Sequence, residues 1–284
     1  MDIKHVLVIG AGTMGHGIAH IAAQAGCQAR LYDIDAAVVE KGLKQVEKNL
    51  RKGLDREKIT QEAYDATLAN IAAASTDLAE AAAKADLIVE AVPERMELKQ
   101  AIFKTLGASA PAHAILATNT SSLPISDIAA ASGRPAQVIG MHFFNPVHIM
   151  KLLEVVRTDE TSEEVVQTAR EIGERFGKTV IVVKDSPGFA TSRLGLVLGL
   201  EAIRMVEEGV ASPEDIDTAL ELGYRHPMGP LKLTDLVGLD VRLGIAKHLA
   251  NVLDDRRFDP PALLQKMVDE GKLGKKSGDR KSVV

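Results

Sequence analysis

Cysteine is almost absent from this sequence, because Cys27 is the only one among 284 residues. A single cysteine allows neither an intrachain disulfide nor a cysteine-rich metal site, so nothing indicates an oxidising compartment. The histidine and carboxylate residues also lack metal-ligand spacing, and we predict no bound metal. Cys27 follows a predicted helix, where we expect an inert packed side chain.

Aromatic residues are scarce, at 3%, and tryptophan is missing, so the core must consist of Ala, Val, Leu and Ile. With 46% hydrophobic residues the chain can bury two ordinary domains. The net charge of -5 lacks the basic excess of a nucleic-acid-binding or membrane-surface protein. No apolar run is long enough to span a bilayer, and the first residues enter a strand without a signal peptide. We therefore expect a cytoplasmic protein with neither membrane nor nucleic-acid partners.

The sequence does contain a glycine-rich turn between a strand and a helix. Residues 4–9 form an apolar run typical of a buried parallel strand, and GAGTMG at 10–15 follows directly. A second strand at 29–32 ends at Asp33, about 20 residues beyond the glycines, as in a Rossmann dinucleotide site. The helix N-terminus and the turn would hold a pyrophosphate, with cofactor contacts from Gly10, Ala11, Gly12, Thr13, Met14 and Gly15. Asp33 would accept hydrogen bonds from a ribose diol and repel a 2′-phosphate, which predicts NAD rather than NADP.

A stripe of basic residues follows on the helix predicted at 36–52. Five of them recur at spacings of three and four: Lys41, Lys44, Lys48, Arg51 and Lys52. They form either a solvated helix surface or a binding site for a polyphosphate group of the substrate. A second helix at 60–68 completes a helical pair inserted at about 36–70.

The remaining strands bring polar residues to one edge of the sheet. Strands at 71–74, 86–92, 114–118, 138–141, 151–156 and 179–183 complete about eight strands. Ligands bind at the carboxyl edge of such sheets, where we expect Glu94, Lys99 and Ser121. Ser122 is assigned instead to capping the helix that begins near Pro124.

The segment 138–156, VIGMHFFNPVHIMKLLEVV, carries the candidate chemistry. Glu154 stands among apolar residues, so its carboxylate needs a partner, and His142 is the candidate. A carboxylate that orients an imidazole supports proton transfer near neutral pH. The same residues also fit a solvated strand glutamate and an ordinary core histidine.

The strand pattern stops at 184–188, KDSPG, which predicts a Rossmann-type domain at 1–184 and an all-helical substrate and dimerisation domain at 185–284. Segment 189–207 is apolar on nearly all sides and must be covered by more than one neighbour. Further helices are predicted at 213–223, 231–236, 240–253 and 261–270. This much apolar surface favours a homodimer.

Taken in order, the motifs GAGTMG, Asp33, TNTSSL, HFFNP, Glu154, DSPGF and PMGP resemble the L-3-hydroxyacyl-CoA dehydrogenase family, closest to its bacterial 3-hydroxybutyryl-CoA dehydrogenases. The resemblance covers nearly the whole chain. It implies NAD-linked oxidation of a (3S)-3-hydroxyacyl-CoA, such as 3-hydroxybutyryl-CoA, to the 3-ketoacyl-CoA, and the reverse reduction.

The resemblance also implies roles for individual residues. His142 matches the catalytic histidine and Glu154 its partner, while Ser121 and Asn145 match residues that place the substrate oxygen and the nicotinamide. Further cofactor contacts are implied at Asp33, Glu94, Lys99 and Lys276. Lys52, with Lys48 on the same stripe, matches a coenzyme A contact.

Three positions depart from the family pattern. Ser192 stands where an asparagine near the substrate is usual, Gln45 where relatives can carry a serine, and the tail DRKSVV lacks the usual glycine-aromatic ending. Two other readings remain open: a dehydrogenase of a different hydroxy acid, and a non-catalytic, crystallin-like dinucleotide-binding protein.

Overall fold

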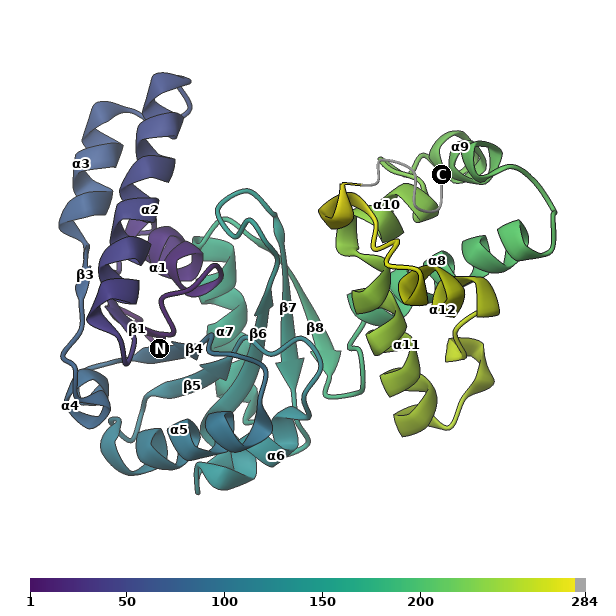
Figure 1. Cartoon of the computed structure of the whole chain (residues 1–284). Coiled ribbons are helices and arrows are strands. Elements are labelled where there is room, and N and C mark those ends of the chain that lie inside the picture. Colours follow the sequence, from purple (N-terminus) through teal and green to yellow (C-terminus); the bar gives the residue numbers. More distant parts are fainter. Residues whose placement is uncertain (279–284) are drawn as a thin grey trace. The chain divides into compact units, whose positions relative to one another are not determined.

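The computed structural model describes residues 1–278 (Figure 1). The atypical tail noted in the sequence, 279–284, lies outside the described residues. The chain divides into two compact units, of which the first covers Met1–Ser186 and the second begins at Pro187. Within the described residues, no helix has the length and apolar character needed to cross a membrane.

An eight-stranded sheet forms the centre of the first unit, in the order β3-β2-β1-β4-β5-β6-β7-β8. The strands are β1 (His5–Ile9), β2 (Gln28–Tyr32), β3 (Ile71–Ala73), β4 (Leu87–Glu90), β5 (Ile115–Thr118), β6 (Val138–Phe143), β7 (Leu152–Arg157) and β8 (Thr179–Lys184). Neighbouring strands are parallel except β6 and β7, which are antiparallel. The strand order changes direction between β1 and β4, the position where doubly wound sheets bind ligands. The predicted fold class is confirmed.

Helices cover both faces of this sheet, which explains why its strands are apolar almost throughout. On one face lie α1 (Gly15–Gln24) and α7 (Glu163–Arg175), and on the other α4 (Leu78–Ala82), α5 (Met96–Ser109) and α6 (Ile125–Ala131) (Figure 1). A short 3₁₀ helix, η1 (Pro135–Gln137), precedes β6. Val6 and Val8 of β1 belong to the core shared with α1 and α7.

Arg175 ties the end of α7 to the start of the chain. Its guanidinium donates hydrogen bonds to the carbonyl oxygens of Ile3, at 2.8 Å, and Ala25, at 3.1 Å. These bonds satisfy the backbone carbonyl groups just before β1 and just after α1.

The predicted helical pair is present as α2 (Ala36–Asp55) and α3 (Gln61–Ala69). Asp35 caps α2 by accepting a hydrogen bond from Ala37 N, and Thr60 caps α3 in the same way through Ala63 N. The two helices share a small core around Val46, Leu50 and Tyr64. Ile71 of β3 packs against the same core, which joins the helical pair to the edge of the sheet.

The second unit is helical, as predicted. It contains α8 (Thr191–Glu207), α9 (Pro213–Gly223), α10 (Pro230–Val237), α11 (Leu239–Leu253), α12 (Ala262–Asp269) and the 3₁₀ helices η2 (Arg256–Phe258) and η3 (Lys275–Ser277). Helix α8 begins two residues later than predicted, because Gly188 and Phe189 have positive φ angles of 76° and 45°. Ser212 caps α9 and Pro213 occupies its first turn, in agreement with the sequence.

Candidate active site

The glycine loop joins β1 to α1 where the strand order changes direction. Gly10 has a φ of 95°, and a Cβ atom there would lie 2.6 Å from the carbonyl oxygen of Ala91, which follows β4. A Cβ atom on Gly15 would overlap the carbonyl oxygen of Gly10. A Cβ atom on Gly12 would meet no atom within 4 Å, so the space beside this residue is open. The loop therefore packs closely against the protein at Gly10 and Gly15 and leaves space for a ligand beside Gly12.

Asp33 lies against this loop from the end of β2. Its Oδ2 atom accepts a hydrogen bond from the backbone N–H of Ala11 at 2.8 Å. The same carboxylate borders a cavity of about 270 Å³, together with Tyr32 and residues of α2. As far as the structure is described, no side chain caps the N-terminus of α1. Free N–H groups beside a carboxylate-lined cavity fit a dinucleotide, with its pyrophosphate on the helix and its ribose at Asp33.

A second cavity, of about 540 Å³, connects the glycine loop to two other segments. Its lining comes from the loop (Gly12, Thr13), from α1 (His16), from α2 (Lys41, Gln45, Asn49) and from the connection after β6 (Asn145, His148). The structure therefore brings Asn145 and Lys41, one member of the α2 stripe, to the same opening as the glycine loop.

His142 and Glu154 form the contact that the sequence predicted. They are opposed in the antiparallel pair of β6 and β7, and Nδ1 of His142 lies 2.7 Å from Oε2 of Glu154. The glutamate side chain is completely buried and the histidine side chain is 9% exposed. Phe144 packs against the imidazole, with ring centroids 4.6 Å apart. A buried carboxylate on Nδ1 fixes the ring orientation and stabilises its protonated form.

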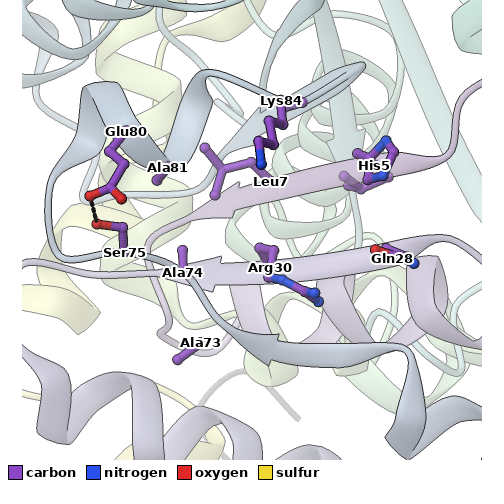
Figure 2. A pocket seen from close by; sticks show the side chains of 12 residues that line it. His5, Leu7, Gln28, Arg30, Ala73, Ala74, Ser75, Glu80, Ala81 and Lys84 are labelled. Atoms are coloured by element: carbon purple, nitrogen blue, oxygen red, sulfur yellow. Dashed lines mark hydrogen bonds between the residues drawn. The ribbon is translucent and has the colours of Figure 1, made fainter.

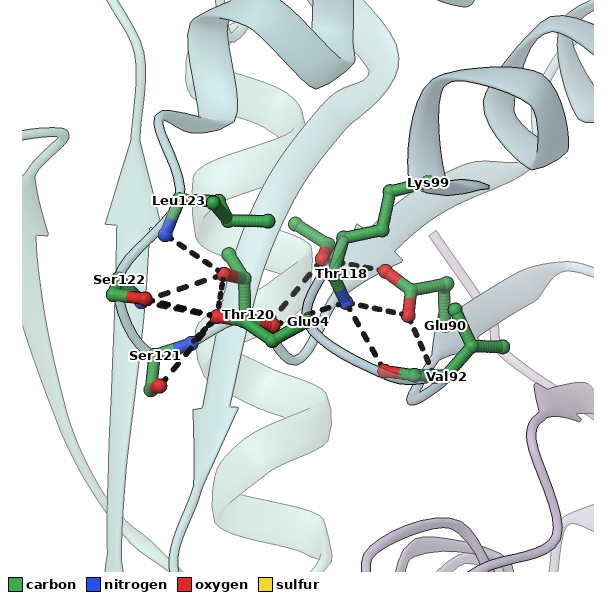
Figure 3. A network of polar contacts seen from close by, with 9 residues as sticks. All are labelled: Glu90, Val92, Glu94, Lys99, Thr118, Thr120, Ser121, Ser122 and Leu123. Carbon is green, nitrogen blue, oxygen red and sulfur yellow. Dashed lines mark hydrogen bonds and ion pairs between the residues drawn. The ribbon is translucent and has the colours of Figure 1, made fainter. Parts of the chain in front are cut away.

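Glu94 organises the loop that carries Ser121 (Figure 3). Its Oε1 atom accepts hydrogen bonds from the Thr120 hydroxyl, at 2.5 Å, and from the backbone N–H of Ser121, at 3.0 Å. Burial of Glu94 raises its pKa, but the Thr120 hydroxyl and the Lys99 charge outweigh this and hold the pKa below the ordinary value. Glu94 is therefore a charged anchor at the sheet edge.

The assignment of Ser122 to a helix cap was wrong. Pro124 occupies the N-cap position of α6, and the N–H of Ser126 in the first turn donates to Oδ2 of Asp185 at 2.9 Å. The Ser122 hydroxyl instead donates to Oε1 of Glu94 at 3.2 Å. The physical reason is that α6 begins at Ile125, so Ser122 lies two residues before the N-cap position, and its hydroxyl donates to a charged acceptor instead.

Lys99 is buried, with 1% of its side chain exposed. Its Nζ atom lies 2.7 Å from Oε1 of Glu90 and 3.3 Å from Oε2 of Glu94. Lys99 therefore does not reach the sheet edge itself, and is connected to it by its ion pair with Glu94. Glu90 was not predicted, although it is a carboxylate within an apolar run, which is the signal that identified Glu154. Strand β4 also ends at Glu90, two residues earlier than predicted, because this carboxylate accepts the N–H of Val92.

Asn119 is a second residue that the sequence analysis did not single out. Its Oδ1 atom accepts a hydrogen bond from the backbone N–H of Phe143 at 2.9 Å. This bond fastens the start of the Ser121 loop to the end of β6, next to His142. No sequence pattern distinguishes an asparagine with this role from an ordinary turn residue.

The basic stripe on α2 separates into two groups. Lys44 pairs with Glu40, and the Arg51 guanidinium lies 5.0 Å from the centre of the Tyr64 ring. Lys41, Lys48 and Lys52 are exposed, and within residues 1–278 none of the three is part of an ion pair. These three lysines are therefore the ones available to a phosphate group.

Two predicted site residues belong to the second unit. Ser192 is the second residue of α8 and is partly exposed, and Lys276 forms an ion pair with Asp240. Their roles toward substrate and cofactor stay predictions.

Another cavity, of about 530 Å³, opens beside α4 over β1 and β2 (Figure 2). Its lining includes His5, Arg30 and Lys84 but no predicted site residue. It is separate from the cluster at the carboxyl edge.

Comparison with known proteins covers both units. The family model described as "3-hydroxyacyl-CoA dehydrogenase, NAD binding domain" matches residues 5–186, and the C-terminal domain model of the same family matches residues 188–282. The chain is 47% identical over 278 residues to a Bacillus subtilis protein named "Probable 3-hydroxybutyryl-CoA dehydrogenase", covering 98% of this chain and 96% of that one.

Other relatives carry the same name. The 3-hydroxybutyryl-CoA dehydrogenase of Bradyrhizobium diazoefficiens is 42% identical over 97% of this chain and 93% of its own length. The crystal structure of (S)-3-hydroxybutyryl-CoA dehydrogenase from Ralstonia eutropha superposes with a TM-score of 0.93 at 39% identity, covering 98% of this chain and 97% of that one.

Proposed function

The chain belongs to the 3-hydroxyacyl-CoA dehydrogenase family and is an NAD-dependent enzyme, and we propose that His142 is its proton acceptor and donor. The substrate is (3S)-3-hydroxybutyryl-CoA, which is oxidised to acetoacetyl-CoA in a reversible reaction. The observation that carries this proposal is the buried 2.7 Å contact between His142 and Glu154 at the edge of the dinucleotide-binding sheet.

Bound NAD supplies the hydride acceptor for the C3 hydrogen. As the hydride leaves, Nε2 of His142 takes the proton of the C3 hydroxyl, since Nδ1 is engaged by Glu154. The Glu154 carboxylate stabilises the imidazolium that results. In the reverse direction the same nitrogen returns the proton to the C3 oxygen.

Ser121 and Asn145 hold the reacting groups in this proposal. The Ser121 hydroxyl and the Asn145 amide would hold the C3 oxygen and the nicotinamide by hydrogen bonds, and so orient the two for hydride transfer. Support comes from Glu94, which anchors Ser121, and from the cavity that Asn145 shares with Gly12 and Thr13. Lys48 and Lys52 bind the phosphates of coenzyme A, because both are exposed cations on α2.

The second unit provides a homodimer interface, and the cytoplasm is the predicted compartment. Helix α8 buries Leu196, Leu200 and Ile203 in its own unit, yet leaves Leu194 67% and Leu198 42% exposed. Apolar side chains exposed on one helix favour coverage by a second copy.

The decisive experiment follows NADH absorbance while acetoacetyl-CoA is added to the purified protein. We expect NADH to be consumed in proportion to the thioester. Consumption with free 3-keto acids but not with the thioester would identify a different hydroxy-acid dehydrogenase. NADH binding without turnover of either compound would favour a non-catalytic dinucleotide-binding protein.

A further inference from the structure

We propose that Glu90 is a positioning residue for this reaction, acting through Lys99 and Glu94 on the loop that carries Ser121. The inference rests on the proposed function of the site. Glu90 is the last residue of β4 and is completely buried. A buried carboxylate is costly unless each of its oxygens is paired, so its partners show what it holds.

The partners of Glu90 come from three segments of the sheet edge (Figure 3). Its Oε1 atom accepts from the backbone N–H of Val92 and from Nζ of Lys99, both at 2.7 Å. Its Oε2 atom accepts from the Thr118 hydroxyl at 2.8 Å. Glu90 therefore joins the end of β4, the end of β5 and the first turn of α5.

Lys99 transmits this anchoring to Glu94. Its ammonium is shared between two carboxylates, at 2.7 Å from Glu90 and 3.3 Å from Glu94. Glu90 thus holds the ammonium more closely, and Glu94 meets it with Oε2 alone. This leaves Oε1 of Glu94 to accept the backbone N–H of Ser121.

The charges of this cluster give Glu90 a second effect. Two carboxylates face one ammonium, so one negative charge remains uncompensated, and it resides at Glu94, whose side chain is 36% exposed at the edge. If Glu90 were neutral, Lys99 would pair with Glu94 alone. Glu94 would then move toward the ammonium and away from Ser121, and would become a weaker acceptor for the cofactor.

The test is a double-mutant cycle on Glu90→Gln and Glu94→Gln, with kcat and KM for NAD measured separately. Glutamine keeps the shape of Glu90 and can still hydrogen-bond Thr118 and Lys99. We expect Glu90→Gln to lower kcat/KM for NAD about 10-fold, within the range for coupled residues of one network. In the Glu94→Gln background, the same change should have little further effect. Additive losses, or an unchanged KM for NAD in Glu90→Gln, would overturn the proposal.

Asp86→Asn is the matched control. Asp86 precedes the opposite end of β4 and accepts hydrogen bonds from the backbone N–H groups of Lys4, at 2.9 Å, and His5, at 2.8 Å. Losing this charge should lower Tm without changing KM for NAD. A KM change as large as that of Glu90→Gln would mean that any lost strand-end carboxylate has this effect, which contradicts a specific role.

Two further measurements keep the result decisive. If Glu90→Gln does not fold, Thr118→Val removes one of the hydrogen bonds to Glu90 and should raise KM for NAD to a smaller extent; no change would count against the proposal. If the wild-type protein binds NADH but has no acetoacetyl-CoA reductase activity, the proposed function fails. The NADH affinity of the same single and double variants then still decides whether Glu90 acts through Glu94.

Discussion

His142 and Glu154 are directly opposed on adjacent antiparallel strands, and their side chains meet at 2.7 Å between Nδ1 and Oε2. Opposed residues of an antiparallel pair point to the same face of the sheet. Both members of the pair are therefore fixed by strands rather than by mobile loops, and the proton acceptor is oriented before substrate binds.

Replacing Glu154 with glutamine should lower kcat while leaving the affinity for NAD nearly unchanged. Glutamine retains a hydrogen bond to His142 but removes the charge that stabilises the imidazolium. The same change should alter the pH dependence of the rate. His142→Gln should cost at least as much, roughly 10² to 10⁴ in rate. Full activity of Glu154→Gln with an unchanged pH profile would show that the pair has no part in the chemistry.

Asp33 should make the enzyme strongly prefer NAD to NADP. Two like charges in contact within a partly desolvated cleft cost on the order of several kcal/mol. Asp33→Asn retains an acceptor for the N–H of Ala11 and should reduce the ratio of kcat/KM values for NAD and NADP. Equal efficiency of the wild-type protein with both cofactors would refute this reading of Asp33.

Short acyl groups should be the better substrates. Several of the relatives are named for 3-hydroxybutyryl-CoA, a C4 thioester. Each added methylene changes binding by only about 1 to 3 kcal/mol, so the preference should grow gradually with chain length. Steady-state kinetics on a homologous series measure this, and comparable kcat/KM for C4 and C16 thioesters would contradict it.

The protein should be a homodimer in solution, with a mass near twice the 30.3 kDa of the chain. Leu194→Glu places a charge on an exposed apolar position of α8 and should shift the equilibrium toward monomer. Ala66→Glu, which makes the same charge change at an exposed position of α3, serves as the control. Light scattering decides the question, and a wild-type mass near that of one chain would rule the dimer out.

Acid should destabilise the protein through His20. Burial, followed by the neighbouring His148, His16 and Lys178, lowers the pKa of His20 from 6.5 to about 4. Above pH 6.5 the residue is neutral in both states and has no effect. As the pH falls from 6.5 toward 4, only the unfolded chain binds the proton, so the free energy of unfolding decreases by up to about 3 kcal/mol.

Denaturant unfolding at pH 7 and pH 4.5 checks this prediction. His20→Gln should lose less stability between the two pH values than the wild-type protein does. His226→Gln, at an exposed position, should lose as much as the wild type. Equal losses in all three proteins would show that other groups govern the acid response.

The sequence predicted the sheet and the glycine loop because their signals are local. Apolar runs bounded by Gly10 or Asp33 indicate buried strands whatever the rest of the chain does. The pair of His142 and Glu154 could also be predicted, because an isolated carboxylate in an apolar strand needs a partner.

The contacts of Glu90 and Ser122 could not be predicted from local sequence patterns. Glu90 is recognisable as a buried acid, but its partners Lys99 and Thr118 are 9 and 28 residues distant. The pairing of β4 with β5 brings Thr118 to Glu90, and the helix α5 brings Lys99. Ser122 satisfied the local rule for a helix cap, yet its hydroxyl donates to Glu94, 28 residues away, and Asp185 accepts the N–H of Ser126 in the first turn of α6. Long-range carboxylates override local preferences, and one chain read alone does not reveal them.

The hydrogen bonds of Arg175 to Ile3 and Ala25 constrain how this protein is made. These two bonds cannot form until residue 175 has left the ribosome. At about 5 to 20 residues per second, this is roughly 10 to 35 s after the first strand is synthesised. During that interval the core to which α7 contributes Val165, Val166, Ala169 and Ile172 is incomplete on the nascent chain. A chaperone that binds emerging apolar segments should therefore associate with the first unit until α7 is complete.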